Sequence, residues 1–166
     1  VVDDGVTTTL YADVDTDGYG DPGQSQAACA IPTGYVADAT DCNDADATVN
    51  PGASEGTADG LDQDCDSKES CYLDQDGDQY GTYGTVSSDL LDCSASGASP
   101  VATDCDDSVA TIYPGATEEV GDAVDQDCDG GDTCLVDGDG DSQGGELKVA
   151  SIDLDCLDEG EAKKGG

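Results

Sequence analysis

Met, Trp, His and Phe are all absent from the 166 residues of this chain, and basic residues are nearly absent. Lys and Arg together number 4, against 40 Asp and Glu, so the formal charge at pH 7 is −36. Because contacts with phosphate groups depend on Lys and Arg, we expect no nucleic-acid partner and no binding to an anionic membrane. No apolar run approaches the ~18 residues of a membrane-spanning helix, so we also expect no membrane insertion. Cations remain as the natural partners.

Aliphatic residues are also scarce, since Val, Ile and Leu total only 25. Few aliphatic residues and a high net charge are typical of disorder, because too little apolar surface is buried on folding. Ordering the backbone costs about 1–2 kcal/mol per residue. A chain of this composition needs another source of order, and its sequence offers two: bound cations and disulfides.

The nine cysteines favour an oxidising compartment. The chain begins at Val1 without Met, and it contains no signal peptide. We therefore expect an exported protein, located outside the cell or at the cell surface after signal-peptide removal.

Of the acidic residues, 33 are Asp and 7 are Glu, which indicates turns and metal-binding loops rather than a solvated acidic face. Three runs place Asp at alternate positions: Asp13, Asp15 and Asp17; Asp74, Asp76 and Asp78; Asp137, Asp139 and Asp141. On a curling loop such side chains converge, and converging carboxylates repel one another unless a cation lies between them. Oxygen ligands in flexible geometry are what Ca²⁺ prefers.

The chain repeats itself with an offset of 63 residues over most of its motifs. Cys42 corresponds to Cys105, and Glu55 corresponds to Glu118. We divide the chain into an N-terminal strand (1–10), acidic repeat 1 (11–70), acidic repeat 2 (71–133), and a half repeat with a tail (134–166).

Secondary-structure signals are short throughout. The segments 6–11 and 34–36 are rich in residues that favour strands. The segments 47–49 and 109–113 have the length of single helical turns before a proline. We expect a small, loop-rich β protein of tandem calcium- and disulfide-stabilised repeats, with short hairpins and little helix.

The alternate-Asp runs resemble the start of an EF-hand loop, which continues with ligands at positions 7 and 9 and a Glu at position 12. Position 7 is Tyr19 in the first run and Tyr80 in the second, and position 9 of the first run is Asp21. Position 12 of the first run is Gln24, so the closing Glu is missing.

The remaining ligands must then come from downstream acidic segments of the same repeat. In repeat 1 these are Asp41, Asp44, Glu55, Asp62, Asp64 and Asp66, and in repeat 2 they are Asp104, Asp107, Glu118, Asp125, Asp127 and Asp129. Each full repeat has enough carboxylates for two ions. The third run, Asp137 to Asp141, has no such downstream half.

The choice of metal follows from the ligand types. Oxygen-only ligands, the absence of His and cysteines tied in disulfides disfavour Zn²⁺ and Cu²⁺. Mg²⁺ demands octahedral geometry and retains water, so we expect several Ca²⁺ ions per chain.

The ordered motifs resemble the MopE-type metal-binding repeat of exported, often surface-attached bacterial proteins. The resemblance rests on Asp13-x-Asp15-x-Asp17-Gly18-Tyr19-Gly20, Thr40-Asp41-Cys42-Asn43-Asp44, Pro51-Gly52-Ala53-x-Glu55 and Asp59-Gly60-x-Asp62-x-Asp64-Cys65-Asp66, and on their copies. It implies metal binding and covers nearly the whole chain. The family usually has a Cys after the Glu of the third motif, where this chain has Gly56 and Glu119. A weaker similarity is to thrombospondin type 3 calcium repeats.

Two disulfide schemes respect the repeat. The first pairs Cys29–Cys42, Cys65–Cys71, Cys93–Cys105 and Cys128–Cys134, leaving Cys156. The second pairs Cys42–Cys65, Cys71–Cys93, Cys105–Cys128 and Cys134–Cys156, leaving Cys29. We prefer the first, because a bridge between Cys65 and Cys71 explains why Leu10 stands in the first repeat where Cys71 stands in the second.

These features favour an extracellular calcium-binding protein with a structural or assembly role. The half repeat leaves an open end, so we expect head-to-tail self-association into a surface fibre or another polymer. The alternatives are a monomeric calcium buffer or metal-scavenging protein, and an adhesion module. We expect no enzymatic activity, because the chain has no His to serve as a base or to activate a cysteine.

Overall fold

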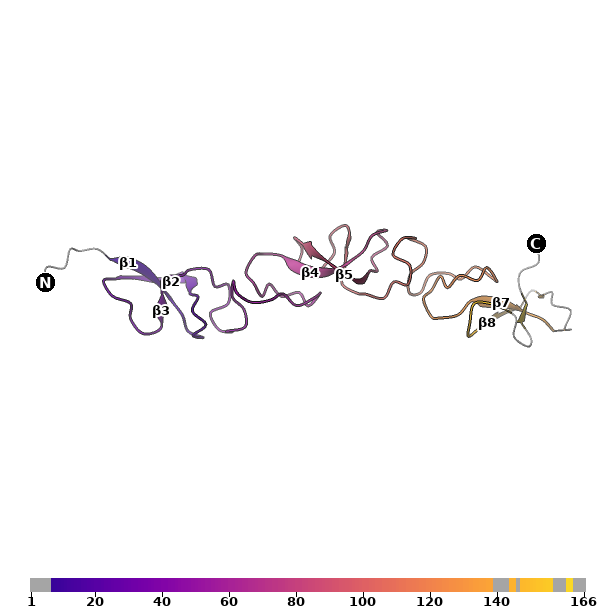
Figure 1. The fold of residues 1–166 in the computed structure, drawn as a ribbon, viewed down its shortest axis with the longest axis horizontal. Helices are drawn as coiled ribbons and strands as arrows, with labels where there is room; N and C mark the ends of the chain where they lie inside the picture. The colour runs from indigo at the N-terminus through magenta and orange to yellow at the C-terminus, as the bar shows by residue number, and fades with distance from the viewer. Residues whose placement is uncertain (1–6, 139–143, 146, 157–160, 163–166) are drawn as a thin grey trace. The chain divides into compact units, whose positions relative to one another are not determined.

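A computed structural model of the chain describes residues 7–138, 144–145, 147–156 and 161–162 (Figure 1). The chain divides into two compact units. The first runs through Cys71 and includes Ser87–Ala95, and the second contains Tyr72–Val86 and the residues from Ser96 onward.

The secondary structure of the described residues consists of three small sheets built on one plan. The earliest strand of each sheet lies at its centre, in the orders β2-β1-β3, β5-β4-β6 and β8-β7-β9. The pairings of β1 with β2 and β3, of β4 with β6, and of β7 with β8 and β9 are antiparallel. The strands are β1 (Thr8–Ala12), β2 (Asp21–Ala28), β3 (Tyr35–Val36), β4 (Glu69–Leu73), β5 (Thr82–Ser88), β6 (Ala98–Ser99), β7 (Thr133–Val136), β8 (Lys148–Ala150) and β9 (Glu161–Ala162). The described residues contain no helix, so no helix among them is long and apolar enough to cross a membrane. The prediction of a small, loop-rich β protein is confirmed.

The strands predicted at 6–11 and 34–36 correspond to β1 and β3. The sequence did not reveal β2, because Pro22 and Gly23 near its start look like a turn. Pro22 is accommodated because β2 lies at the edge of its sheet, where a missing N–H breaks no ladder. A register shift between Tyr11 and Ala12 marks the point where β1 approaches the first acidic loop.

The predicted helical turns at 47–49 and 109–113 are hydrogen-bonded turns rather than helices. Val49 N–H donates to the carbonyl of Asp46 at 2.9 Å, and Ile112 N–H donates to the carbonyl of Val109 at 2.8 Å. No second turn follows either one, so the chain leaves the helical path before Pro51 and Pro114.

The buried apolar residues are few and small. A position on the central strand of each sheet is fully buried: Leu10 on β1, Cys71 on β4 and Cys134 on β7. In the second sheet Glu69 and Ser99 are fully buried as well. The loops between strands carry most of the acidic residues.

Candidate metal centre

The first acidic loop, residues 13–20, connects β1 to β2. Two of its residues have positive φ, Thr16 at 68° and Gly18 at 98°, and they turn the backbone in a tight curl. Within this curl Asp17 N–H donates to Asp15 Oδ1 at 3.2 Å, and Tyr19 N–H donates to Asp17 Oδ1 at 2.8 Å. One carboxylate oxygen from each of Asp13, Asp15 and Asp17 lies within 4.8 Å of the other two.

A second segment, 41–44, closes over this loop from about thirty residues downstream. Asp41 N–H donates to the carbonyl of Gly20 at 3.2 Å, and Val14 N–H donates to Asp44 Oδ1 at 2.6 Å. Oxygens of Asp15, Asp41 and Asp44 form a second group within 4.8 Å. We call these five aspartates, Asp13, Asp15, Asp17, Asp41 and Asp44, the loop cluster of unit 1.

Gly20 is required for this closure. A Cβ placed on it would lie 2.8 Å from both the carbonyl oxygen of Asp38 and Cβ of Tyr11. Real Cβ atoms do not approach other heavy atoms this closely, so only glycine fits between Tyr11 and the backbone of Asp38, just before segment 41–44.

The loop cluster contains five buried carboxylate oxygens without a hydrogen-bond partner, one on each of its members: Asp13 Oδ1, Asp15 Oδ2, Asp17 Oδ2, Asp41 Oδ2 and Asp44 Oδ2. Asp13 is 8% exposed and Asp41 is 2% exposed. Burial raises the pKa of the Asp15 and Asp41 carboxyls, and the neighbouring carboxylates raise both further. Buried polar atoms are nearly always hydrogen-bonded, so a set of unpaired oxygens facing one another fits the donor set of a hard cation.

Unit 2 builds the same arrangement between β4 and β5, with positive φ at Gly77 and Gln79. Gln75 N–H donates to Asp107 Oδ1 at 2.7 Å, as Val14 does to Asp44 in unit 1. Asp104 N–H donates to the carbonyl of Gly81 at 3.1 Å. The loop cluster of unit 2 therefore contains Asp74, Asp76, Asp78, Asp104 and Asp107.

The second loop cluster differs from the first in how its oxygens are used. Both oxygens of Asp74 accept backbone N–H groups, from Gly77 at 2.7 Å and Gln79 at 3.1 Å. Unpartnered buried oxygens remain on Asp76, Asp78 and Asp104. Burial raises the pKa of Asp76 and Asp104, and charged neighbours add to the shift.

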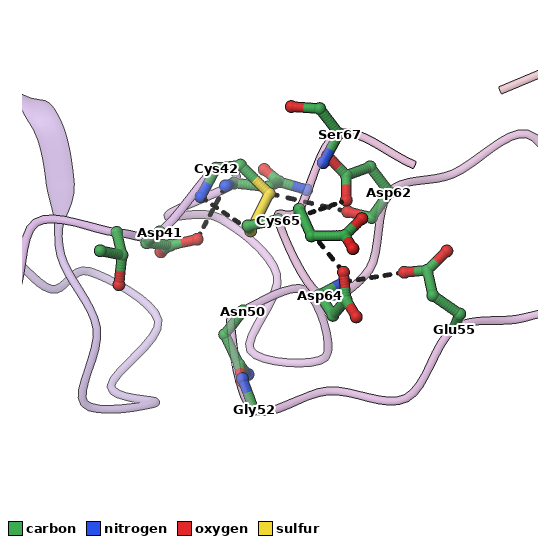
Figure 2. Close-up of a disulfide and its surroundings, with 12 residues drawn as sticks. Asp41, Cys42, Asn50, Gly52, Glu55, Asp62, Asp64, Cys65 and Ser67 are labelled. Carbon is green, nitrogen blue, oxygen red and sulfur yellow. Dashed lines mark hydrogen bonds between the residues drawn. A yellow bond between two sulfur atoms is a disulfide. The ribbon is translucent and has the colours of Figure 1, made fainter. Parts of the chain in front are cut away.

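A separate group of carboxylates lies further along each repeat. Oxygens of Glu55, Asp62 and Asp64 lie within 4.8 Å of one another, and Asp64 N–H donates to Glu55 Oε1 at 2.9 Å (Figure 2). Asp62 accepts from Asp66 N–H and from Ser67 N–H, both at 3.0 Å. We call Glu55, Asp62 and Asp64 the Glu cluster of unit 1.

The backbone of this second group repeats that of the first loop. Cys65 and Ser67 have φ of 58° and 65°, at the same positions relative to Asp62 as Thr16 and Gly18 hold relative to Asp13. In unit 2, Cys128 and Gly130 have φ of 59° and 98°. The alternate-Asp spacing at 62–66 and 125–129 indicates a second curled acidic loop in each repeat. From the sequence we instead interpret these segments as ligand donors to the first loop.

At the 63-residue offset, the residues of unit 2 that correspond to the Glu cluster are Glu118, Asp125 and Asp127. Glu118 Oε1 accepts from Gln126 N–H at 2.7 Å and Asp127 N–H at 3.1 Å, and Oε2 accepts from Thr133 N–H at 3.2 Å. Burial raises the pKa of Glu118. This glutamate therefore holds the acidic loop to β7 by three backbone hydrogen bonds.

The structure thus brings Asp41 and Asp44 to the first loop, as predicted, and assembles Asp62 and Asp64 elsewhere with Glu55. Asp66 and Asp129 are exposed, and each accepts a backbone N–H two residues on, from Lys68 and Gly131. Asp21 accepts from Gly23 N–H and from the Gln24 side chain on its own strand, so its carboxylate serves β2 rather than the loop cluster.

The two tyrosines at position 7 direct their side chains to the Pro-Gly segments. A Cβ on Gly52 would lie 3.0 Å from the Tyr19 hydroxyl, and the Tyr80 ring stacks on Tyr113 with centroids 5.4 Å apart. Only their backbone carbonyls remain as candidate ligands. In the third run, Asp137 is half-buried, and Asp139 and Asp141 lie outside the described residues.

The disulfide scheme that we preferred from the sequence is wrong. The four bridges are Cys42–Cys65, Cys71–Cys93, Cys105–Cys128 and Cys134–Cys156. Cys29, rather than Cys156, lies outside them, and it is exposed. Leu10 occupies the buried position of the first sheet that Cys71 and Cys134 occupy in the other two. The first sheet therefore has an apolar side chain at its centre where the others have a disulfide.

These features define a class: tandem, disulfide-bonded acidic repeats whose loops gather carboxylates around shared points. Residues 41–69 and 104–132 match the family model Cu-binding MopE, described as a putative metal-binding motif. Two segments of the chain therefore match the MopE-type motif, and the resemblance stated from the sequence is confirmed for them. The family's name refers to copper rather than calcium. Comparisons with curated proteins and with solved structures found no match.

Proposed function

We propose that this chain is an extracellular calcium-binding repeat protein with a structural role, in which each ion joins two distant segments of one repeat. The observation that carries this proposal is the set of five buried, unpartnered carboxylate oxygens in the loop cluster of unit 1. They come from segments about thirty residues apart, so an ion held between them acts as a crosslink rather than as a local clamp. In a chain with so small a core, this crosslink would provide much of the folding free energy.

The donor set supports Ca²⁺ over copper. The loop clusters offer only carboxylate and carbonyl oxygens, the chain has no His or Met, and eight of its cysteines are in disulfides. Copper binds best to imidazole, thioether and thiolate ligands, whereas calcium takes six to eight oxygens. The Glu clusters offer further oxygens of the same kind.

Native mass spectrometry under non-reducing conditions, with and without chelator, tests this proposal. We expect about three or more Ca²⁺ per chain, released by the chelator together with the compact charge-state distribution. A chain that binds no ion at millimolar calcium, or that exchanges bound Ca²⁺ for equimolar Cu²⁺, would refute it. Calcium-dependent folding separates a structural role from that of a buffer, which binds ions without needing them to fold.

We further propose head-to-tail self-association, in which a second copy supplies carboxylates to the third acidic run. Each described loop cluster takes its closing carboxylates from a segment about thirty residues downstream, and the third run has the same alternate-Asp spacing as the first two. Size-exclusion chromatography with light scattering in calcium tests this. We expect species larger than the monomer that dissociate in chelator, and a monomer at high protein concentration in calcium would contradict it.

A further inference from the structure

Three leucines of unit 1 are exposed where a loop meets a turn. Leu61, Leu90 and Leu91 are 57%, 48% and 40% exposed. Leu61 lies in the second acidic segment of the repeat, and Leu90 and Leu91 lie in the turn that follows β5. A Cβ placed on Gly60 would lie 3.7 Å from the carbonyl oxygen of Leu91, so the loop and the turn are in contact. We call Leu61, Leu90 and Leu91 the apolar patch of unit 1.

The backbone on both sides of this patch is held in place by hydrogen bonds. Leu61 N–H donates to Asp59 Oδ1 at 3.0 Å. Ser88 Oγ donates to the carbonyl of Leu90 at 2.9 Å and accepts from the N–H of the same residue at 3.0 Å. Cys93 N–H also donates to the Leu90 carbonyl, at 3.1 Å, and the disulfide of Cys93 ties the end of the turn to β4. The leucines are therefore exposed on an ordered backbone rather than on a loose loop.

Unit 2 exposes aliphatic side chains at the same places. Ile152 and Leu154, in the turn that follows β8, are exposed, and Val124 is half-buried. At the 63-residue offset, Val124 corresponds to Leu61 and Leu154 corresponds to Leu91. We call Val124, Ile152 and Leu154 the apolar patch of unit 2.

Asp132 connects the loop and the turn of the second patch. Its Oδ2 accepts from Ala123 N–H at 2.9 Å, and its own N–H donates to the carbonyl of Asp153 at 3.0 Å. Both units therefore hold aliphatic side chains in water on an ordered backbone. Because a chain with so few aliphatic residues gains little by exposing them, the recurrence of this arrangement marks an interaction surface.

Aspartates surround the aliphatic residues of both patches in the sequence. They are Asp59, Asp62, Asp89 and Asp92 in unit 1, and Asp122, Asp125, Asp153 and Asp155 in unit 2. Hydrogen bonds from the side chain and the backbone of Ser94 lower the pKa of Asp92, so that this carboxylate stays charged at neutral pH. Lys68 Nζ lies 3.8 Å from Asp89 Oδ1, which shows that this acidic rim accepts a cationic side chain.

We propose that the two apolar patches bind a basic, amphipathic segment of another protein, in which apolar side chains alternate with Lys or Arg. Its apolar side chains cover the aliphatic residues of a patch, and its cationic side chains pair with the surrounding aspartates. The charge of −36 attracts such a partner over a distance. The same charge disfavours a second copy as the occupant, because two acidic rims would face each other. This surface is separate from the loop clusters, and its binding does not rest on calcium.

Fluorescence anisotropy of labelled synthetic peptides, titrated with the full chain, tests the proposal. The probe is a peptide of alternating Leu and Lys, and its two controls replace every Leu by Ser or every Lys by Glu. We expect the probe to bind at least about tenfold more tightly than the Ser control, because it covers apolar surface as well as pairing charges. The Glu control should not bind. Raising the salt from about 0.05 M to about 0.5 M should weaken binding of the probe at least about tenfold.

Two matched variants separate the patches from the rest of the surface. Leu61→Ser with Ile152→Ser removes one exposed side chain from each patch, and we expect it to weaken binding of the probe about tenfold. Ile31→Ser with Leu147→Ser removes equally exposed side chains outside the patches and should leave the affinity unchanged. Far-UV circular dichroism confirms that each variant keeps the fold.

Three results would overturn the proposal. The first is equal affinity for the probe and the Ser control, which would mean that charge alone binds the peptide. The second is an equal loss of affinity in the two variants. The third is displacement of the probe by phosphatidylcholine vesicles, which would assign the patches to a lipid surface. Because every comparison is made under one buffer condition, in calcium and again in chelator, the outcome is independent of whether the chain binds calcium.

Discussion

Replacing Asp15 by Asn should stabilise this protein without calcium, and calcium should cancel or reverse that gain. Asp15 belongs to both oxygen groups of the unit 1 loop cluster, so it faces all four other members. Asn keeps the size of the side chain and one carbonyl oxygen but removes the charge. The substitution therefore separates the repulsion within the cluster from its contribution to ion binding.

Two like charges 4.8 Å apart repel by about 3 kcal/mol at an effective dielectric constant of 20. Burial and charged neighbours raise the pKa of Asp15, so its charged form is disfavoured in the cation-free cluster. We expect D15N to stabilise the cation-free chain by about 1–3 kcal/mol. In saturating calcium, the loss of one charged ligand should weaken binding about a hundredfold, which removes about 2.7 kcal/mol of calcium-dependent stabilisation. Added to the gain of the cation-free chain, this leaves a net change in calcium between about zero and a loss of roughly 2 kcal/mol.

Urea unfolding monitored by tyrosine fluorescence, in chelator and in calcium, measures both effects. The matched control is D89N, which removes the same charge from a side chain that is 89% exposed and forms an ion pair with Lys68 at 3.8 Å. We expect D89N to change the midpoint little in either condition. If D15N destabilises the chain equally with and without calcium, or behaves as D89N does, the assignment of the cluster as an ion site is wrong.

Three further results are expected. G20A should weaken calcium binding and destabilise unit 1 by about 1–3 kcal/mol in calorimetry, because its Cβ would meet backbone at 2.8 Å, while G84A should be tolerated because its Cβ meets neighbours at 3.5 Å or more. E69Q should raise the free energy of unfolding at neutral pH by about 1 kcal/mol, because burial raises the pKa of Glu69 and disfavours its charged form. D132N should lower it by about 1–2 kcal/mol, because both oxygens of Asp132 accept backbone N–H groups. The pKa of Asp41 is raised in the folded state, so protonated Asp41 favours folding of the cation-free chain. This contribution is fully present below pH ~4 and is lost as the pH rises through the folded-state pKa. As the pH rises over this range, the denaturant midpoint should therefore fall in chelator and rise in calcium.

The sequence predicted most of the local chemistry of this fold. Alternate Asp residues predicted curled loops, and the 63-residue offset predicted that unit 2 would repeat unit 1. It also indicated that Asp41 and Asp44 would return to the first loop, because no closing Glu follows within the loop itself. These predictions succeeded because they depend on spacing, which local backbone geometry translates directly.

What failed depends on contacts between distant segments. Cysteine counting left two disulfide schemes open, and the preferred one rested on Leu10, whose real role is to fill the sheet centre. Likewise, Asp62 and Asp64 have the same spacing as the first loop, yet only the fold shows that they gather with Glu55 rather than with Asp13. The edge position that lets Pro22 lie in a strand is also set by strand order, which the sequence does not reveal.

The disulfides follow one another along the chain without overlapping, and this has a mechanical consequence. Each disulfide closes a loop of 22 or 23 residues that a pulling force cannot extend, which is roughly 70 Å of chain length. A pulling force on the oxidised chain would pass from bridge to bridge and stretch only the segments outside them. The first sheet, with Leu10 in place of a bridge, would open without the limit that a bridge sets, and a reductant would release the contour that the four bridges withhold.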